Sequence, residues 1–359
     1  MTEKSLIILR LKMDRKRNSC IVYTLSRTFV IKDINYLKKI GRKVFEIKSS
    51  PKKNIFLFLI NRINEFFKSL IVLSKSGSVF IWFSDYHSFI PLVVSKFFTV
   101  KSIIIVGGYD AISDKEIGHG IFAKKGLRQT IAKLNYYLSS EIWVVDRSLS
   151  EGCKVALEQN KIKSGLINWM PDLKTKIRIT PTGYSSNFWR RTKEKKPNTI
   201  LTVANINHSR IIEIKGISLI FNLAKQVPEF KFQIIGLENK SLIETYKKPK
   251  NVKFIKPKKD QDLRDYYSES QYYIQPSRLE GLPNALCEAM LCECIPIGNK
   301  VFGIPKAIGT TGLLFDGSRD IKKIVVFLKA NKKINSNQAR RRIINLFNEE
   351  KRMDALRKV

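Results

Sequence analysis

Short apolar runs, repeated along the chain and separated by helical stretches, most constrain how these 359 residues can fold. Each run indicates a strand buried on both faces of a sheet. Between two of them, residues 55–71 place Ile55, Leu59, Ile63, Phe66, Phe67 and Leu70 on one helical stripe. Strands that alternate with helices predict a parallel, doubly wound sheet. The first strands are predicted at Ser19–Leu25, Val44–Ile47, Val79–Phe83, Ser102–Val106 and Glu141–Val145.

The same pattern restarts after residues 181–198, a segment rich in turn formers and charge that is typical of a linker. We therefore expect two Rossmann-like α/β domains facing each other across a cleft, over residues 1–185 and 186–335. A C-terminal helix at 336–359 is expected to pack back toward the first domain. In the second domain, strands are predicted at Thr199–Ala204, Phe232–Ile235, Val252–Ile255, Gln271–Gln275 and Ile295–Ile297, with helices at Ile217–Lys225 and Asp262–Glu269.

Composition limits the functional class. Hydrophobic residues make up 43% of the chain, which indicates a globular protein. The net charge of +35 indicates an anionic partner, such as nucleic acid, a membrane surface or a phosphorylated substrate, or else a proteome that uses Lys freely on surfaces. The clustered Cys287, Cys292 and Cys294 lack a neighbouring histidine and zinc-site spacing, so we expect structural thiols in a reducing cytosol and no metal. Neither a signal peptide nor a transmembrane helix is expected.

The segment SRLEGLPNALCEAM, residues 277–290, holds two glutamates, Glu280 and Glu288, around a Gly-Leu-Pro. It links a predicted strand to a helix that begins near Pro283, and a helix N-terminus presents free N–H groups that suit phosphate. A carboxylate can accept hydrogen bonds from two adjacent sugar hydroxyls. The pattern is therefore consistent with a nucleotide-sugar site. The pattern alone favours somewhat an ordinary strand-turn-helix that carries two exposed acids.

A longer stretch, PSRLEGLPNALCEAMLCECIPIGNKVFGIPKAIGTTGLLFD, resembles the donor-site signature of the retaining GT-B glycosyltransferases of sequence family 4. RITPTGYSSNFW resembles the family's interdomain linker, and TILTVANINHSRIIEIKG resembles its first strand and phosphate-binding loop, which ends in Lys-Gly. IIIVGGYDAISDKEIGHG resembles an N-terminal-domain segment of some members. The resemblance runs from about residue 80 to the C-terminus and is strongest over residues 270–315.

The resemblance implies a role for each matching residue. Glu288 would hold the ribose hydroxyls, Glu280 would lie by the donor sugar, and Lys215 would neutralise the diphosphate leaving group, with Arg210 in place of the family's arginine. Such a cation stabilises the negative charge that forms when a sugar–phosphate bond breaks. The remaining implied contacts are Gly281, Leu282, Pro283, Asn205 and Ile255 to the donor, and Gly107, Gly108 and Asp110 on the acceptor side.

The sequence departs from the family pattern at several places. Glu293 stands where the family has Gly, Phe302 where it has the first Gly of a pair, and Lys306 where it has Glu. The loop before Lys215 is longer than usual. The position of the histidine common in the family's N-terminal domain falls near Gly107, so that histidine is absent. These changes put the details of the donor pocket, and the activity itself, in question.

The N-terminal half is rich in Lys and Arg, and residues 55–73 are amphipathic with aromatic side chains. Such a helix can lie on anionic lipid. A doubly wound domain also needs helices to cover its sheet, and we expect residues 55–73 to be one of these. Lipid contact, at the inner face of the plasma membrane, is the alternative.

The sequence thus predicts a cytoplasmic, retaining, metal-independent glycosyltransferase that needs no cofactor. It would move a hexose from a UDP- or GDP-sugar to a glycan or lipid-linked acceptor of a cell-surface polysaccharide. A sugar-nucleotide epimerase of the same architecture and a degenerate member that only binds sugar nucleotides remain open. A nucleic-acid partner is not expected, because the charge is spread over the chain and no nucleic-acid motif is present.

Overall fold

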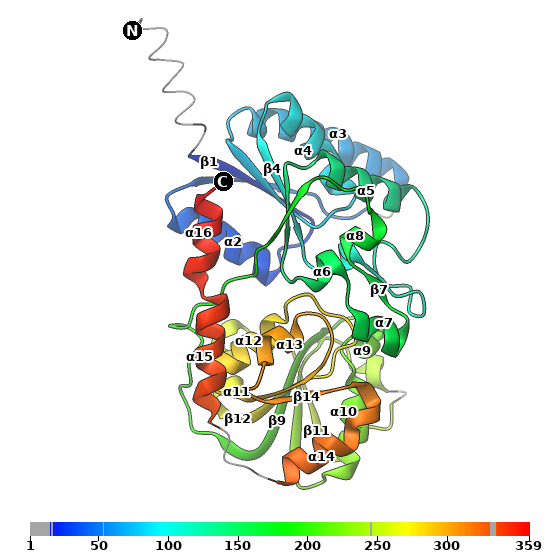
Figure 1. Ribbon diagram of the computed structural model, residues 1–359, viewed down its shortest axis with the longest axis vertical. Coiled ribbons are helices and arrows are strands. Elements are labelled where there is room, and N and C mark those ends of the chain that lie inside the picture. Colours follow the sequence, from blue (N-terminus) through cyan, green and yellow to red (C-terminus); the bar gives the residue numbers. More distant parts are fainter. Residues whose placement is uncertain (1–14, 16, 53, 245, 331–334) are drawn as a thin grey trace, which may run out of the picture. The chain divides into compact units, whose positions relative to one another are not determined.

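The computed structural model describes residues 15, 17–52, 54–244, 246–330 and 335–359, and the chain divides into two compact units. Unit 1 comprises residues 1–152, 162–183 and 350–359, and unit 2 comprises residues 153–161 and 184–349. Each unit is an α/β structure built on one parallel sheet of six strands. Figure 1 labels many of the helices and strands of both units.

The sheet of unit 1 contains every strand predicted in this half, with ends shifted by two residues at most. It has the order β2-β1-β3-β4-β6-β8, and all neighbours are parallel. The edge strand β8 was not predicted. The strands are β1 (Asn18–Tyr23), β2 (Lys43–Lys48), β3 (Ser78–Trp82), β4 (Lys101–Val106), β6 (Glu141–Val144) and β8 (Lys176–Ile179), and β5 (Ile112–Ser113) pairs separately with β7 (Lys163–Ser164).

Helices of unit 1 connect these strands, and one arrives from the far end of the chain. They are α2 (Thr28–Lys39), α3 (Ile55–Leu73), α4 (Tyr86–Phe97), η1 (Tyr109–Ala111), α5 (Leu127–Leu138), α6 (Ser148–Glu151), α8 (Leu166–Trp169) and α16 (Glu349–Arg357), whose first residue belongs to unit 2.

The helix α16 is fastened by a buried ion pair. Arg352, which is 1% exposed, donates from Nε to Asp33 Oδ1 at 2.9 Å and from Nη2 to Asp33 Oδ2 at 2.6 Å. Its Nη1 donates to the carbonyl of Thr180, and its guanidinium lies against the rings of Trp82 and Trp143. One bidentate pair of hydrogen bonds and two aromatic rings offset the cost of removing this charge from water.

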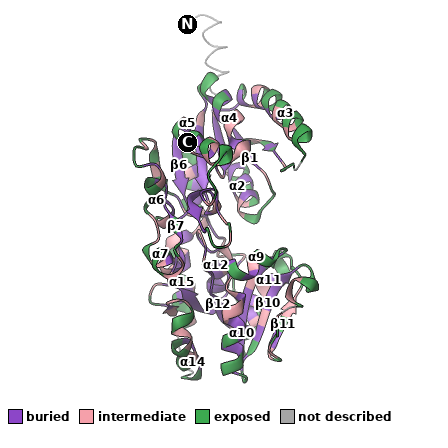
Figure 2. Ribbon diagram, turned by 90° about the vertical axis from the view of Figure 1, so that its right-hand side faces the viewer, coloured by how far each residue is buried: buried purple, intermediate pink, exposed green. Residues whose placement is uncertain are grey.

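Helix α3 corrects the expectation of a sheet-covering helix at residues 55–73. Of the apolar stripe expected to face the sheet, Ile55, Leu59, Ile63, Phe66 and Phe67 are exposed and Leu70 is partly buried. The buried residues of the helix are Glu65, Ser69 and Leu73. Figure 2 draws α3 largely in the colour of exposed residues. The polar side faces the protein, where Asn61 and Arg62 donate hydrogen bonds to Ser49 Oγ.

The sheet of unit 2 contains all five strands predicted for the second half. Its order is β11-β10-β9-β12-β13-β14, again parallel throughout. The three-residue edge strand β14 was not predicted. The strands are β9 (Lys196–Ile206), β10 (Lys231–Leu237), β11 (Val252–Ile255), β12 (Ser270–Gln275), β13 (Ile295–Asn299) and β14 (Leu313–Phe315).

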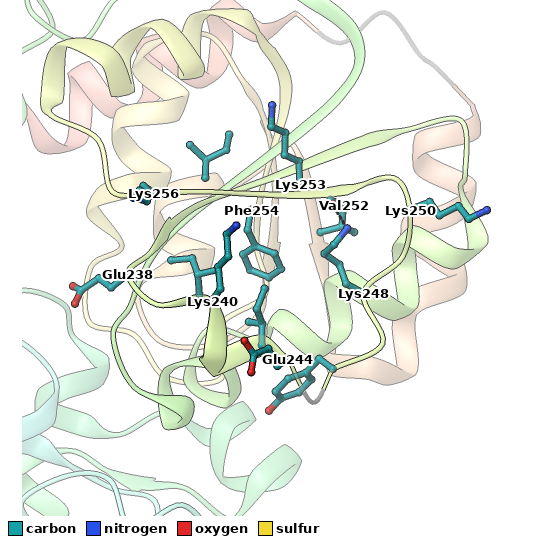
Figure 3. A pocket seen from close by; sticks show the side chains of 13 residues that line it. Glu238, Lys240, Glu244, Lys248, Lys250, Val252, Lys253, Phe254 and Lys256 are labelled. Carbon is teal, nitrogen blue, oxygen red and sulfur yellow. Dashed lines mark hydrogen bonds between the residues drawn. The ribbon is translucent and has the colours of Figure 1, made fainter.

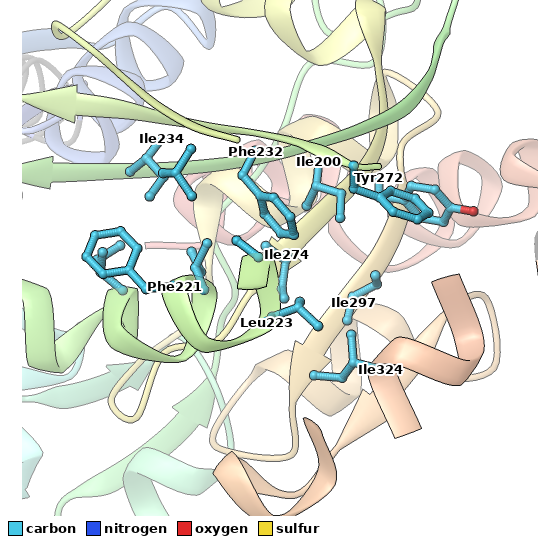
Figure 4. Packing of buried hydrophobic residues seen from close by; sticks show 14 of the residues in the cluster. Ile200, Phe221, Leu223, Phe232, Ile234, Tyr272, Ile274, Ile297 and Ile324 are labelled. Atoms are coloured by element: carbon cyan, nitrogen blue, oxygen red, sulfur yellow. The ribbon is translucent and has the colours of Figure 1, made fainter. Parts of the chain in front are cut away.

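A single apolar cluster fills one side of this sheet (Figure 4). Phe221 and Leu223 of α10 meet Ile200, Phe232 and Ile274 of the strands there. The helices of unit 2 are α7 (Lys154–Asn160), α9 (Ser209–Ile214), α10 (Ile217–Gln226), η2 (Lys240–Ile243), α11 (Asp260–Glu269), α12 (Asn284–Leu291), α13 (Ile304–Ile308), η3 (Gly317–Asp320), α14 (Ile321–Lys329) and α15 (Ser336–Phe347).

The C-terminal segment 336–359, expected as one helix, is two helices. Asn348 has an extended backbone, with φ −61° and ψ 146°, and ends α15 before α16 begins. α15 belongs to unit 2 and residues 350–359 to unit 1, so the break lies where the chain passes from one unit to the other.

Candidate functional site

The candidate site lies in unit 2, where the loops after β9 and β12 begin. These strands are parallel neighbours, with Ile200 opposite Tyr272 and Leu201 opposite Tyr273. Thr202 Oγ1 also donates to the carbonyl of Ile274 at 2.9 Å. Because the carboxyl ends of parallel neighbours meet at one edge of a sheet, the two loops leave from the same edge.

Gly216 brings these two loops into contact. It has φ +65°, and a Cβ built on it would lie 2.2 Å from the carbonyl oxygen of Pro276, which directly follows β12. The N–H of Arg278 donates to the carbonyl of Ile214 at 3.0 Å. A larger residue at 216 would push the loops apart, so glycine here fixes the position of Lys215 against residues 276–280.

Lys215 and Glu280, the two residues assigned to the chemistry, form an ion pair. Lys215 Nζ lies 2.7 Å from Glu280 Oε2 and 3.1 Å from Oε1. The two side chains are 23% and 13% exposed, so a ligand can reach the pair from water. Unit 2 therefore presents a cation and a carboxylate together at the carboxyl edge of its sheet.

Glu288 lies on α12 and is 7% exposed. It acts electrostatically on the Tyr273 hydroxyl, which donates to Gln275 Oε1 at 3.0 Å and accepts from the N–H of Val203 at 3.3 Å. Burial, and then the charges of Glu280 and Glu288, raise the pKa of Tyr273 well above its usual 10. The hydroxyl therefore keeps its proton. The alternative of two exposed acids on a solvated helix is wrong, because Glu288 is buried and Glu280 is ion-paired.

The Gly-Leu-Pro segment between the glutamates is held through its backbone. The carbonyl of Gly281 accepts from the N–H of Gly303 at 3.0 Å, and a Cβ on Gly303 would lie 2.4 Å from that same oxygen. Leu282 and Pro283 are buried, and Pro283 directly precedes the first residue of α12. The segment thus ends at a helix N-terminus, where backbone N–H groups point outward.

Three other residues assigned to the donor site lie elsewhere in unit 2 and do not take part in the ion pair between Lys215 and Glu280: Arg210, Asn205 and Ile255. Arg210 is an exposed residue of α9, and its N–H donates to Nδ1 of His208 at 3.1 Å. Asn205 is exposed near the end of β9.

Ile255 lines a pocket of about 730 Å³ between β11 and the segment that follows β10, together with Phe254 and several lysines (Figure 3). Lys215, Glu280 and Glu288 are not among the residues that line this pocket. The structure therefore gathers Lys215 and Glu280 but leaves Ile255 in a separate hollow of the same unit.

The residues assigned to the acceptor form a closed turn in unit 1. Asp110, fully buried, accepts from the N–H groups of Gly107 and Gly108 at 3.2 Å each and from the N–H of Ser84 at 3.1 Å. Burial raises its pKa to about 6, and these N–H groups oppose that rise. The carboxylate of Asp110 thus shapes the turn from inside rather than facing a ligand.

Two departures from the family pattern lie at left-handed backbone positions. Glu293 has φ +62° and Phe302 has φ +51°. Glu293 follows α12 in a Schellman motif, in which its N–H donates to the carbonyl of Met290 and that of Cys294 donates to the carbonyl of Ala289. Glycine is favoured at such a position because it has no Cβ. The third departure, Lys306, lies over the ring of Phe347.

Two supporting residues were not anticipated. The Lys-Gly motif contains Gly216, but no role was assigned to this glycine from the sequence. The motif itself is the sequence feature that could have identified it. Asn299, at the end of β13, donates from its amide nitrogen to the carbonyl of Ser277 and accepts from the N–H of Gly317. It braces the loop that carries Glu280, and nothing in the sequence pattern marked it.

Metal ligands do not gather in the part of the chain that the structure describes: no group of three or more His, Cys, Asp or Glu side chains is placed to hold an ion there. All five cysteines lie in the described residues, and none forms a disulfide. Metal independence stays a prediction.

Comparisons with known proteins identify the architecture. Residues 185–349 match the family model described as glycosyl transferases group 1, which is slightly less than half of the chain. A comparison with curated protein sequences gives no match. The fold is similar to that of sucrose-phosphate synthase from Thermosynechococcus elongatus, with TM-score 0.72 and 14% identity over 95% of this chain and 97% of that one.

Two further structures cover almost the whole chain. A glycosyltransferase from Rickettsia africae has TM-score 0.69 and 14% identity over 96% of this chain and 97% of that one. HepE from Anabaena, solved with UDP and glucose, has TM-score 0.68 and 11% identity over 95% and 98%. The match over residues 185–349 and the shared fold together show that the chain has the GT-B fold and that its second unit is similar to the glycosyl transferases group 1 family.

Proposed function

We propose that this protein is a glycosyltransferase that retains the anomeric configuration and transfers a sugar from a UDP- or GDP-sugar to a hydroxyl of a glycan or lipid-linked acceptor. We place it in the cytoplasm, in the synthesis of a cell-surface polysaccharide, with anionic membrane as a neighbouring surface. Unit 2 would bind the donor and unit 1 the acceptor. The observation that carries the proposal is the Lys215–Glu280 pair, held at the carboxyl edge of the sheet and reachable from water.

The chemistry follows from where charge forms. When the bond between the sugar carbon and the distal phosphate oxygen breaks, the diphosphate gains negative charge, and a fixed cation lowers the energy of that state. Without a ligand, Glu280 neutralises Lys215. A bound diphosphate would take over that role, which would free Glu280 to accept hydrogen bonds from the sugar hydroxyls. Glu288 would accept from the ribose hydroxyls, while the N–H groups at the start of α12 would face the phosphates.

The experiment measures nucleoside diphosphate released from UDP-glucose and, separately, from GDP-mannose, without acceptor and with a chelator present. UDP-glucose is the first choice because the similar HepE structure contains UDP and glucose. Lys215→Ala should lower turnover about 10²- to 10³-fold, the usual effect of losing one positioned charge. Lys225→Ala, an exposed lysine on α10, is the matched control and should leave turnover unchanged.

The alternatives give different results in the same assay. An epimerase would change the configuration of a sugar carbon in the nucleotide sugar instead of passing the sugar to an acceptor. A degenerate member would bind donor without any turnover. Equal rates for Lys215→Ala and wild type would remove the leaving-group role, and anomeric NMR of the product of an added acceptor tests retention.

A further inference from the structure

Helix α3 exposes a broad apolar face to solvent. Nine of its large apolar side chains are between 43% and 72% exposed, namely Ile55, Phe56, Leu57, Leu59, Ile60, Ile63, Phe66, Phe67 and Ile71. Single exposed apolar residues are ordinary, but a contiguous apolar surface on one helix marks a site that another surface covers.

The rotation of α3 is fixed by polar contacts on its inner side. Glu65, 3% exposed, lies 2.7 Å from Arg62 Nη1. Arg62 Nη2 and Asn61 Nδ2 both donate to Ser49 Oγ. Burying a charged pair costs free energy, and so does exposing apolar surface to water. The free-energy cost of exposing apolar side chains to water disappears if the outer face of α3 contacts an apolar medium.

The helices next to α3 also expose apolar side chains. α4 packs beside α3, and α5 packs beside α4. Phe97 of α4 is 78% exposed and Leu127 of α5 is 68% exposed, with Val93, Leu134 and Tyr137 also exposed. We call these three helices with their exposed apolar side chains the α3–α5 face.

Charge selects the occupant of this face. The only acidic residue of α3, α4 and α5 is Glu65, which is buried. Their other charged residues are basic, and Lys68 and Lys96 are exposed beside the apolar side chains. The chain carries a net charge of +35. A second copy would bring like charges together, whereas an anionic surface is attracted to them.

We propose that the α3–α5 face docks on an anionic lipid bilayer, with α3 lying in the plane of the interface and its apolar side chains among the acyl chains. Among the described residues, no helix is long and apolar enough to cross a membrane. An interfacial helix instead keeps one polar side and one apolar side, as α3 does. This proposal deepens the membrane contact stated above and rests on neither the donor site nor its chemistry.

The test is cosedimentation of the full chain with phosphatidylcholine vesicles that contain phosphatidylglycerol, and with phosphatidylcholine alone. Wild type should bind the anionic vesicles, release with added salt, and bind the neutral vesicles weakly. The double variant Phe56→Ser/Phe67→Ser should bind the anionic vesicles at least on the order of tenfold more weakly than wild type, because it removes two aromatic side chains from the bilayer. Val326→Ser, an equally exposed apolar residue on α14 in unit 2, is the control and should bind like wild type.

A second variant keeps the proposal testable if the double variant does not fold. Lys68→Glu/Lys96→Glu changes only exposed charges and should weaken anionic binding while leaving the melting temperature unchanged. Equal binding of the serine or glutamate variants and wild type would overturn the proposal. Equal binding to neutral vesicles would do the same, as would light scattering showing a wild-type dimer that Phe56→Ser/Phe67→Ser dissociates. Donor turnover in solution is measured in parallel, so a failure of docking is distinguishable from a failure of the proposed transfer.

Discussion

Helices α10 and α3 have similar apolar stripes and opposite surroundings. α10 turns Ile217, Ile220 and Phe221 into the core of unit 2, while α3 turns its apolar side outward and buries Glu65 and Ser69. An apolar stripe on a helix therefore indicates that its side chains are buried, but it does not indicate which surface they pack against. For α10 the receiving surface is the sheet; for α3 it lies outside the protein.

The two units also treat charge differently. Unit 1 buries the ion pair Asp33–Arg352, whereas unit 2 keeps Lys215 and Glu280 partly exposed. A buried pair serves the fold because no ligand can reach it. A reachable pair can exchange its partner, which is what binding a charged substrate requires.

The largest expected effect concerns the buried pair of unit 1. Arg352→Ala leaves Asp33 buried without its partner and should lower the free energy of unfolding by about 3–5 kcal/mol. Arg357→Ala removes an exposed pair with Asp354 on the same helix and should cost about 1 kcal/mol or less. Thermal melts of both variants check this, and similar melting temperatures would contradict the assignment of Arg352 to the interior.

The next effect compares one substitution in the two helices. Phe221→Ala empties a core position and should cost about 3–5 kcal/mol. Phe67→Ala, made on the outer face of α3, should change stability by no more than about 0.5 kcal/mol in water. Urea unfolding without lipid measures both. If Phe67→Ala were as costly as Phe221→Ala, α3 would turn its apolar side inward after all.

The polar inner side of α3 predicts a pH effect. Burial raises the pKa of Glu65 from 4.5 to about 7, against the opposing charge of Arg62. The native state then holds a proton that the unfolded state has lost, so this group lowers stability as pH rises from 4.5 to about 7. Glu65→Gln removes this pH dependence. As pH rises from 4.5 to about 7, the free energy of unfolding of Glu65→Gln should therefore increase relative to that of wild type by on the order of 2–3 kcal/mol.

Unfolding of both proteins at about pH 5 and about pH 8 measures the effect of Glu65→Gln. Asp110, whose pKa is raised to about 6, titrates in both proteins and cancels in the difference. If the free energy of unfolding changed with pH in the same way in both proteins, Glu65 would be exposed to solvent. The polar side of α3 would then not face the protein, and α3 would not differ from α10 in this respect.

The smallest expected effect is a gain in unit 2. Glu293→Gly relieves a left-handed backbone and should stabilise the protein by up to about 1 kcal/mol, less whatever the exposed pair with Arg191 contributes. Glu293→Ala is the matched control, because it loses the same pair and keeps the strain. Melts should therefore rank the glycine variant above the alanine variant, and the reverse order would refute backbone strain at this position.

Much of the fold could be predicted because strands buried on both faces have a clear apolar signature. β8 was missed because Lys176–Ile179 is a largely exposed edge strand, and β14 because it has three residues. Periodicity found α3 but not its rotation, which depends on hydrogen bonds from Asn61 and Arg62 to Ser49, a residue that lies outside the helix.

The sequence named candidate site residues one by one but did not predict the contact between them. The motifs pointed to Lys215 and Glu280 separately, while their pairing depends on how Gly216 packs against Pro276. Asp110 was assigned to the acceptor side through the resemblance of its Gly-Gly-Tyr-Asp segment to the family, and that resemblance does not show whether the carboxylate is exposed. Its burial follows from N–H groups that converge on it only in the folded chain.

The hydrogen bonds between Asp33 and Arg352 join residues 319 positions apart. During synthesis, Asp33 leaves the ribosome roughly 15–60 s before Arg352, at about 5–20 residues per second. Through that interval the first half of the chain holds a carboxylate, and two tryptophan rings, whose partner does not yet exist. The half that is made first is therefore completed last, and a premature stop codon that removes only α16 would damage the N-terminal half of the protein.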